Sequence, residues 1–215
     1  MRKYKKGKYL TFVVSIDGPA AAGKGTIGRS LATHFSFSYL DTGLLYRAVA
    51  SKALMTGRDP IEIATQLSEK DLRQSNLRNL EVAKEASRIA IVPEVRIALK
   101  IFQEEFSQKG NGAILDGRDI GTVICPDADI KFFILASSTV RAKRRFAELQ
   151  KSNHSTTFEV VLSEILARDK MDADRTYSPM IKPKDAFVLD TSDLSIIDAV
   201  NTAKSLVQRV ISEKN

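Results

Sequence analysis

The segment Gly18-Pro19-Ala20-Ala21-Ala22-Gly23-Lys24-Gly25-Thr26 holds a single lysine among glycine, alanine and proline. Side chains this small allow successive backbone N–H groups to turn inward and surround an anion such as a phosphate chain. The spacing from Gly18 to Lys24 matches a phosphate-binding loop whose lysine reaches the outer phosphates as a point charge. We therefore predict that this loop binds a nucleotide.

The neighbouring residues fit this interpretation better than an ordinary Gly/Ala turn, because a strand-like run precedes the loop and a helical stretch follows it. The positive end of that helix adds to the attraction for phosphate. Many such loops place Ser or Thr directly after the lysine, where the hydroxyl ligates Mg²⁺. Here Gly25 stands at that position and the hydroxyl moves to Thr26. We expect no direct protein ligand, and a Mg²⁺ ion held by ATP and water.

Charged residues also follow two other apolar runs. Asp41-Thr42-Gly43 leads to Arg47, and Asp116-Gly117-Arg118-Asp119 follows the run 113–116. In a parallel sheet both would lie at the carboxyl edge, where ligands bind. A GTPase would carry the guanine-reading motif N/T-K-x-D, which this sequence does not contain.

A third cluster contains Arg168, Asp172 and Arg175, spaced i, i+4, i+7, so a helix would present them on one face. Alone, an i,i+4 Arg–Asp pair is more often a solvated salt bridge. Beside a phosphate-binding loop it suits a phosphorylated sugar. Phosphoryl transfer needs chiefly alignment and charge stabilisation, which lysine and arginines supply. No general base is required when the acceptor is an anionic phosphate oxygen.

The elements that must position these residues alternate along the chain. Five short apolar runs predict strands at 11–17, 35–40, 113–116, 130–136 and 186–190. Helical stretches are predicted at 24–34, 43–55, 80–108, 138–150, 157–171 and 195–212. Near-continuous apolar strands indicate a parallel sheet with helices on both faces, and their alternation with helices indicates an α/β fold. Residues 56–79 and 151–157 are polar and weakly periodic, and we interpret them as attachments to this core.

Composition narrows the class of protein. One cysteine, Cys125, fits a reducing cytoplasm and a buried small hydrophobe, and with two histidines a soft-ligand metal cluster is implausible. No apolar run is long enough to span a membrane. The net charge is +7, and residues 1–9 carry five positive charges and no acid. We interpret 1–9 as a flexible tail; contact with nucleic acid or acidic lipid is the alternative.

Together these motifs resemble the bacterial cytidylate kinases from about residue 11 to residue 210. The resemblance is carried by six stretches: 16–26, 41–47, 86–96, 116–122, 136–145 and 168–175. It implies ATP-dependent phosphorylation of CMP and dCMP with Mg²⁺, by a cytoplasmic enzyme that we expect to be a monomer requiring no membrane or nucleic acid. It also implies a P-loop NTPase fold in one kinase domain, residues 10–215, with a monophosphate-binding insert at about 43–100 and a lid at about 146–165.

The resemblance also implies site residues. For catalysis these are Lys24, Arg118, Arg168 and Arg175. For ATP binding they are Gly18, Pro19, Ala20, Ala21, Ala22, Gly23, Lys24, Gly25, Thr26, Arg141 and Arg145. For substrate binding they are Thr42, Arg47, Ser87, Arg96, Arg118, Asp119, Arg168, Asp172 and Arg175. Arg47 and Arg118 would hold the acceptor phosphate, and Ser87, Arg96 and Asp119 would read cytosine. For Arg141 and Arg145 the alternative is a solvated basic helix face beside Lys143 and Arg144.

Two departures from the family pattern stand out. Thr42 replaces the usual serine, and about 20 residues of a small antiparallel sheet are missing before Ala86. Two other functions stay open: a kinase for another acceptor, UMP or AMP, and a nucleotide-gated RNA-binding protein that uses the tail. Asp119 distinguishes CMP from UMP as the acceptor, because a carboxylate pairs with the exocyclic amine of cytosine, where uracil presents a carbonyl.

Overall fold

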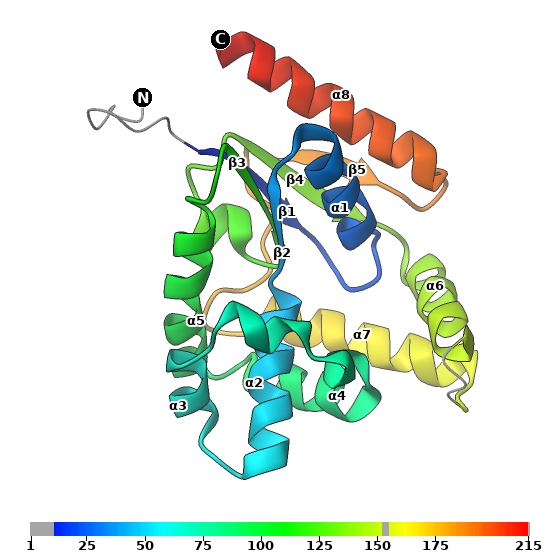
Figure 1. Ribbon diagram of the computed structural model, residues 1–215. Coiled ribbons are helices and arrows are strands. Elements are labelled where there is room, and N and C mark those ends of the chain that lie inside the picture. Colours follow the sequence, from blue (N-terminus) through cyan, green and yellow to red (C-terminus); the bar gives the residue numbers. More distant parts are fainter. Residues whose placement is uncertain (1–10, 152–154, 215) are drawn as a thin grey trace. The chain divides into compact units, whose positions relative to one another are not determined.

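The structure is a computed structural model that describes residues 11–151 and 155–214 (Figure 1). The predicted tail at 1–9 lies outside these residues, as do residues 152–154 of the predicted lid. The chain forms two compact units. We call Met1–Tyr39 with Ser107–Asn215 the core unit, and Leu40–Phe106 the inserted unit.

A five-stranded sheet has the order β2-β3-β1-β4-β5. Its strands are β1 (Phe12–Asp17), β2 (Ser38–Asp41), β3 (Gly112–Gly117), β4 (Ile130–Leu135) and β5 (Phe187–Asp190). The pairs β1/β3, β1/β4 and β4/β5 are parallel, which confirms the prediction of a parallel sheet. The observed strands differ from the predicted runs by a few residues at their ends.

The core unit also contains helices, and all but the last of them lie between strands along the chain. They are α1 (Lys24–Phe35), the short π-helix η3 (Ile120–Ile124), α6 (Ser138–Lys151), α7 (Phe158–Asp174) and α8 (Ile196–Lys214). Figure 1 shows α1 and α8 side by side along the sheet, and the two helices are in contact. Cys125 follows η3 and is buried, as predicted.

The central strand β1 has two different faces, because successive side chains of a strand point to opposite sides. Val14 and Ile16 join the hydrophobic core that α1 and α8 complete. Ser15 and Asp17 point the other way, and both are fully buried. This second face contacts η3. The alternation therefore places a hydroxyl and a carboxyl group beneath the loop that follows β3.

The inserted unit consists of helices: α2 (Gly43–Thr56), α3 (Pro60–Thr65), η1 (Glu69–Arg73), η2 (Ser75–Arg78), α4 (Leu80–Ile89) and α5 (Pro93–Phe106). The prediction of one helix over 80–108 was wrong. Pro93 has no backbone N–H and its ring clashes with the preceding turn of a helix, so the first helix ends at Ile89 and a second begins at Pro93.

No helix was predicted in the interval 56–79, but the structure contains α3, η1 and η2 there. Asp59 caps α3 by accepting a hydrogen bond from the Ile61 N–H, and Pro60 takes the first helical position. Ser68 and Asp71 form a reciprocal capping box at η1. These caps are visible in the sequence as D-P and S-x-x-D. They are the signals that could have revealed both helices.

Candidate active site

The glycine-rich loop joins β1 to α1, as its motif requires. Gly18 has φ +140° and Gly23 has φ +97°, values that glycine adopts readily. A Cβ atom on Gly18 would lie 2.1 Å from the carbonyl oxygen of Ile134 on β4. Gly23 then occupies the N-cap position of α1. Both glycines are needed for the loop to turn tightly against the sheet.

Lys24 begins α1 and is 94% buried, with 6% of its surface exposed. Its Nζ donates a hydrogen bond to the Pro19 carbonyl at 2.9 Å and lies 3.9 Å from Oδ1 of Asp116. The ammonium group is thus held across the loop. With no acidic residue in the first turn of α1, the positive end of the helix adds to its charge. The loop is therefore suited to bind an anion.

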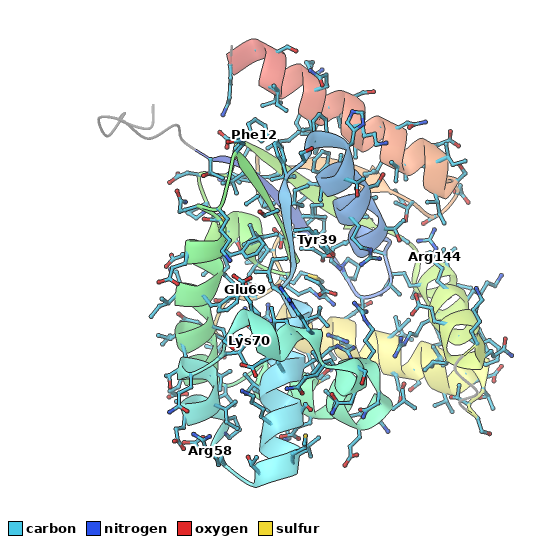
Figure 2. All side chains as sticks on the ribbon, viewed as in Figure 1. Phe12, Tyr39, Arg58, Glu69, Lys70 and Arg144 are labelled. Atoms are coloured by element: carbon cyan, nitrogen blue, oxygen red, sulfur yellow. The ribbon has the colours of Figure 1, made fainter. Side chains whose placement is uncertain are left out.

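Tyr39 explains why a glycine stands at position 28, inside α1. A Cβ atom at Gly25 would lie 3.4 Å from the Tyr39 hydroxyl, and one at Gly28 would lie 2.6 Å from its ring. The hydroxyl donates a hydrogen bond to Oδ2 of Asp116 at 3.0 Å (Tyr39 is labelled in Figure 2). At Gly25 a Cβ atom would make only ordinary contact with Tyr39, and its nearest neighbour would be Nη1 of the Arg29 side chain at 3.2 Å. Packing against Tyr39 therefore requires glycine at position 28.

Four predicted residues form one ionic cluster in the core unit. The Arg118 Nε donates to Oδ2 of Asp172 at 2.8 Å. Arg175 lies 3.5 Å from Asp172 and 3.9 Å from Asp119. The predicted helical face is wrong for Arg175, because α7 ends at Asp174 and Arg175 has extended backbone angles. Its Nε donates to the Ser178 carbonyl at 2.5 Å, so the loop after α7 directs this arginine to the cluster.

The electrostatics of the cluster keep Asp172 ionised. Burial opposes its ionisation, but the positive charges of Arg118 and Arg168 outweigh burial and lower the pKa of Asp172 below its usual value. Arg175 acts in the same direction. One carboxylate thus holds several guanidinium groups, which would otherwise repel one another. Such a group of cations suits a phosphate that carries more than one negative charge.

Asp17, the last residue of β1, was not singled out from the sequence. Its two carboxyl oxygens accept hydrogen bonds from the Ile120 and Gly121 N–H groups at 2.8 and 2.7 Å. Complete burial raises the pKa of Asp17 to about 7, although the two hydrogen bonds favour the ionised form. The only sequence signal is an acid at the carboxyl end of an apolar strand.

Arg141 was predicted on the ATP side, and its guanidinium group is bonded to protein atoms. It binds Asp169 of α7 through two hydrogen bonds of 3.0 and 2.6 Å. It also donates to the Ala136 carbonyl at 2.8 Å and the Ala20 carbonyl at 3.3 Å. Arg145 forms an i,i+3 ion pair with Glu148 at 3.1 Å.

Arg144, which the sequence analysis named only in the alternative of a solvated face, contacts the loop after β5. It donates to the hydroxyl of Thr191 at 3.0 Å and to its carbonyl at 2.7 Å (Arg144 is labelled in Figure 2). The Thr191 hydroxyl in turn donates to the Ala22 carbonyl at 2.9 Å. Sequence reasoning missed both residues, because no local pattern joins positions so far apart.

Within the inserted unit, α2, α4 and α5 carry the predicted substrate residues. Arg47 on α2 donates to the Leu77 carbonyl at 2.9 Å. Arg96 on α5 is buried, donates to the Ala90 carbonyl at 3.2 Å and lies over the Tyr46 ring at 5.5 Å. The Ser87 hydroxyl on α4 donates to the Ala83 carbonyl at 3.0 Å. Thr42 is buried directly before α2.

Two further findings concern the described residues alone. Within 11–151 and 155–214, no group of three or more His, Cys, Asp or Glu side chains is placed to hold a metal ion. In the same residues no helix combines the length and the apolar character needed to cross a membrane.

The parallel sheet and the glycine-rich loop between β1 and α1 define a P-loop kinase fold. Solved structures share this fold. A gluconokinase from Sinorhizobium meliloti superimposes with a TM-score of 0.52 at 11% identity, covering 96% of this chain and 97% of its own. A shikimate kinase from Bacteroides thetaiotaomicron gives 0.50 at 14%, covering 92% and 98%.

The sequence profile of the family described as cytidylate kinase matches residues 14–209. A cytidylate kinase of Cereibacter sphaeroides is 48% identical over 199 residues, which cover 93% of this chain and 96% of the relative. One from Paramagnetospirillum magneticum is 45% identical, covering 92% and 98%, and one from Rhizobium meliloti is 44% identical, covering 95% and 100%. The chain belongs to the cytidylate kinase family.

Proposed function

We propose that this chain transfers the γ-phosphoryl group of ATP to CMP, and to dCMP, and releases ADP with CDP or dCDP. The observation that carries the proposal is the pairing, in one unit, of a phosphate-binding loop with the cluster of Arg118, Asp119, Asp172 and Arg175. Relatives named cytidylate kinase, similar over nearly their whole length, support the choice of CMP.

On the donor side, the backbone N–H groups from Gly18 to Thr26 bind the β- and γ-phosphates. Lys24 exchanges its hydrogen bond to the Pro19 carbonyl for a phosphate oxygen, and its charge follows the transferred group. The residues fit a Mg²⁺ ion that arrives with ATP and is held by phosphate oxygens and water, because the exposed Thr26 on the first turn of α1 offers a hydroxyl that can hydrogen-bond to such a water. When bound, Mg²⁺ neutralises charge on the β- and γ-oxygens.

On the acceptor side, Arg118, Arg168 and Arg175 neutralise the phosphate of CMP and the charge that spreads over the transferred oxygens. Asp172 keeps these arginines in place and meets the sugar. The attacking atom is an anionic phosphate oxygen, so in-line transfer needs no general base. Removal of one of these arginines is expected to reduce the rate on the order of 10³-fold or more.

Cytosine is read by Asp119, which accepts a hydrogen bond from the exocyclic amine. The resemblance to the family assigns further contacts to the inserted unit: Arg47 to the acceptor phosphate, and Ser87 and Arg96 to the base. The lid at about 146–165 would exclude water, so that ATP is not hydrolysed. Slower hydrogen exchange at 150–160 with a bisubstrate analogue would support the lid, and equal exchange would contradict it.

We also propose that the enzyme acts as a monomer in the cytoplasm. Cys125 is the one cysteine of the sequence, so the chain forms no internal disulfide and does not require an oxidising compartment to fold. Sedimentation of the purified chain with and without ATP tests the oligomeric state, and a dimer would contradict it.

A coupled assay of ADP release tests the function, with ATP, Mg²⁺ and each of CMP, dCMP, UMP and AMP. We expect turnover of CMP and dCMP, and its loss in Lys24→Met. Asp119→Ala should lower the preference for CMP over UMP by about tenfold to a hundredfold, with little change in ATP binding, because one charged hydrogen bond is lost. Turnover of AMP or UMP alone would contradict the proposal, as would full activity of Lys24→Met.

A further inference from the structure

The carboxyl group of Asp17 joins two loops that are remote in sequence. Asp17 ends β1 and directly precedes Gly18, the first residue of the phosphate-binding loop. Its two oxygens accept hydrogen bonds from Ile120 and Gly121, which are 103 and 104 positions away along the chain. These two residues directly follow Arg118 and Asp119.

These hydrogen bonds satisfy backbone N–H groups that have no acceptor within their own helix. Ile120 and Gly121 begin η3, and the first N–H groups of a helix have no acceptor within that helix. Asp119, which precedes them, has φ −141° and ψ 22° and does not cap the helix with its own side chain. Asp17 supplies the missing acceptors from the sheet. Short π-helical turns of this kind occur frequently at functional sites.

Close packing fixes the same loop against β1. A Cβ atom at Gly121 would lie 2.9 Å from the Ser15 Oγ, 3.0 Å from Cγ of Pro183 and 3.2 Å from Oδ2 of Asp17. Glycine at position 121 therefore allows the backbone to approach the carboxyl group closely. The loop cannot shift toward the strand without a clash, and it cannot move away without losing two hydrogen bonds.

We propose that Asp17 is a positioning residue that couples the two substrate loops. Its carboxyl group fixes the backbone behind Arg118 and Asp119 in relation to the phosphate-binding loop that begins at Gly18. It touches neither reactant, and the kinetic part of the proposal rests on the proposed function. The expected benefit is alignment, because a small displacement of the acceptor phosphate from in-line geometry costs a large factor in rate.

Asp17→Asn tests the proposal. Asparagine keeps the shape, but one oxygen becomes an NH₂ group, which faces a backbone N–H group and cannot accept its hydrogen bond. We expect KM for CMP to rise about tenfold to a hundredfold, with a fall in kcat and in the preference for CMP over UMP. The Kd of ATP should change less than about threefold, because the loop's own backbone binds the phosphates.

Ser15→Ala is the matched control, since Ser15 lies on the same face of β1, is fully buried, and its hydroxyl makes no hydrogen bond in the part of the chain that the structure describes. It should leave KM for CMP as in the wild type. A rise of both KM values by one common factor in Asp17→Asn would indicate a general loss of structure and would overturn the proposal. So would wild-type kinetics.

Amide hydrogen exchange of the nucleotide-free protein gives a readout that does not depend on activity. Exchange at 118–124 should accelerate in Asp17→Asn, and stay unchanged in Ser15→Ala. Unchanged protection at 118–124 overturns the coupling, whereas failure of the wild type to phosphorylate CMP overturns only the proposed function. Should Asp17→Asn fail to fold, Gly121→Ala displaces the loop through the added Cβ. It should give the same kinetic and exchange pattern, and wild-type behaviour of that variant refutes the proposal.

Discussion

Single residues around the phosphate-binding loop are selected by the space that their neighbours leave. Gly28 lies one helical turn beyond Lys24, in the interior of α1, where alanine would normally favour the helix by about 1 kcal/mol. The ring of Tyr39 occupies the space, and a Cβ atom at Gly28 would approach its Cε2 to 2.6 Å. Packing against one aromatic ring therefore outweighs helix propensity at this position.

Gly28→Ala should destabilise the protein by about 1–3 kcal/mol, since an extra methyl group must displace a packed ring. Urea unfolding of the single variant against the wild type measures this loss. In a Tyr39→Leu background the clash is relieved and helix propensity remains, so the same substitution should become neutral or stabilising. An equal loss in both backgrounds would contradict the role given to Tyr39.

Sequence reasoning placed correctly the residues whose position in the fold depends on near neighbours. The loop 18–26 was predicted from its own spacing, and its placement between β1 and α1 follows from the flanking apolar and helical runs. It failed for Asp17, Arg144 and Thr191, because their partners are many tens of positions away and no local pattern marks them. Arg175 shows the limit inside one motif. Its i+7 spacing predicted a helical face, but the helix ends one residue earlier.

At the scale of elements, Arg141 links three segments that hold predicted site residues. From α6 it binds Asp169 of α7 and the Ala20 carbonyl in the phosphate-binding loop. The same helix α7 carries Arg168 and Asp172. Arg141 could therefore act in two ways: by direct contact with ATP, as predicted, or indirectly, by holding the loop against α7. Only the indirect role requires Asp169.

Arg141→Ala and Asp169→Asn separate the two roles. If Arg141 holds the loop and α7 together, both variants should raise KM for ATP by about tenfold, because each breaks the same bidentate pair. If Arg141 serves ATP directly, Asp169→Asn should leave its guanidinium group available and KM for ATP unchanged or lower. We expect the first outcome in steady-state kinetics at saturating CMP.

Arg209→Ala is the control for this pair of variants, because among the described residues Arg209 forms an exposed i,i+4 ion pair with Glu213 and a contact with the Phe187 ring. Its removal should change neither KM for ATP nor KM for CMP.

The order of elements was predictable, since apolar runs alternate with helical ones, but helix ends were not. Pro93 divides the predicted helix 80–108, and the caps at Asp59 and Ser68 create short helices where polar composition suggested irregular chain.

At the scale of the whole molecule, buried and paired carboxyl groups set the pH dependence of stability in opposite directions. Among the described residues, a lowered pKa is found for carboxyl groups whose charged forms are bound by cations, hydroxyls or backbone N–H groups: Asp71, Glu85, Asp172, Asp185 and Asp190. Their stabilisation is present above their ordinary pKa values of 3.8 and 4.5 and is lost as the pH falls below them.

Asp17 changes the stability of the protein with pH in the opposite direction. Burial raises its pKa from 3.8 to about 7, with a smaller contribution from the charge of Asp119 and an opposing one from Lys24. Between these two values the folded state binds the proton more tightly than the unfolded state, so stability falls as the pH rises. The full penalty above pH 7 is roughly 4 kcal/mol, at about 1.4 kcal/mol for each pH unit between 3.8 and about 7.

The two effects together predict a stability maximum on the acid side of neutrality, between about pH 4.5 and 6. Urea unfolding of the wild type from pH 4 to pH 8 should show it. In Asp17→Asn the group no longer titrates, so its free energy of unfolding should lack the decline from pH 5 to pH 7.5. The stability of the wild type relative to this variant should therefore fall over that interval. A constant difference would mean that Asp17 stays ionised throughout, and that its two backbone hydrogen bonds outweigh the cost of burial.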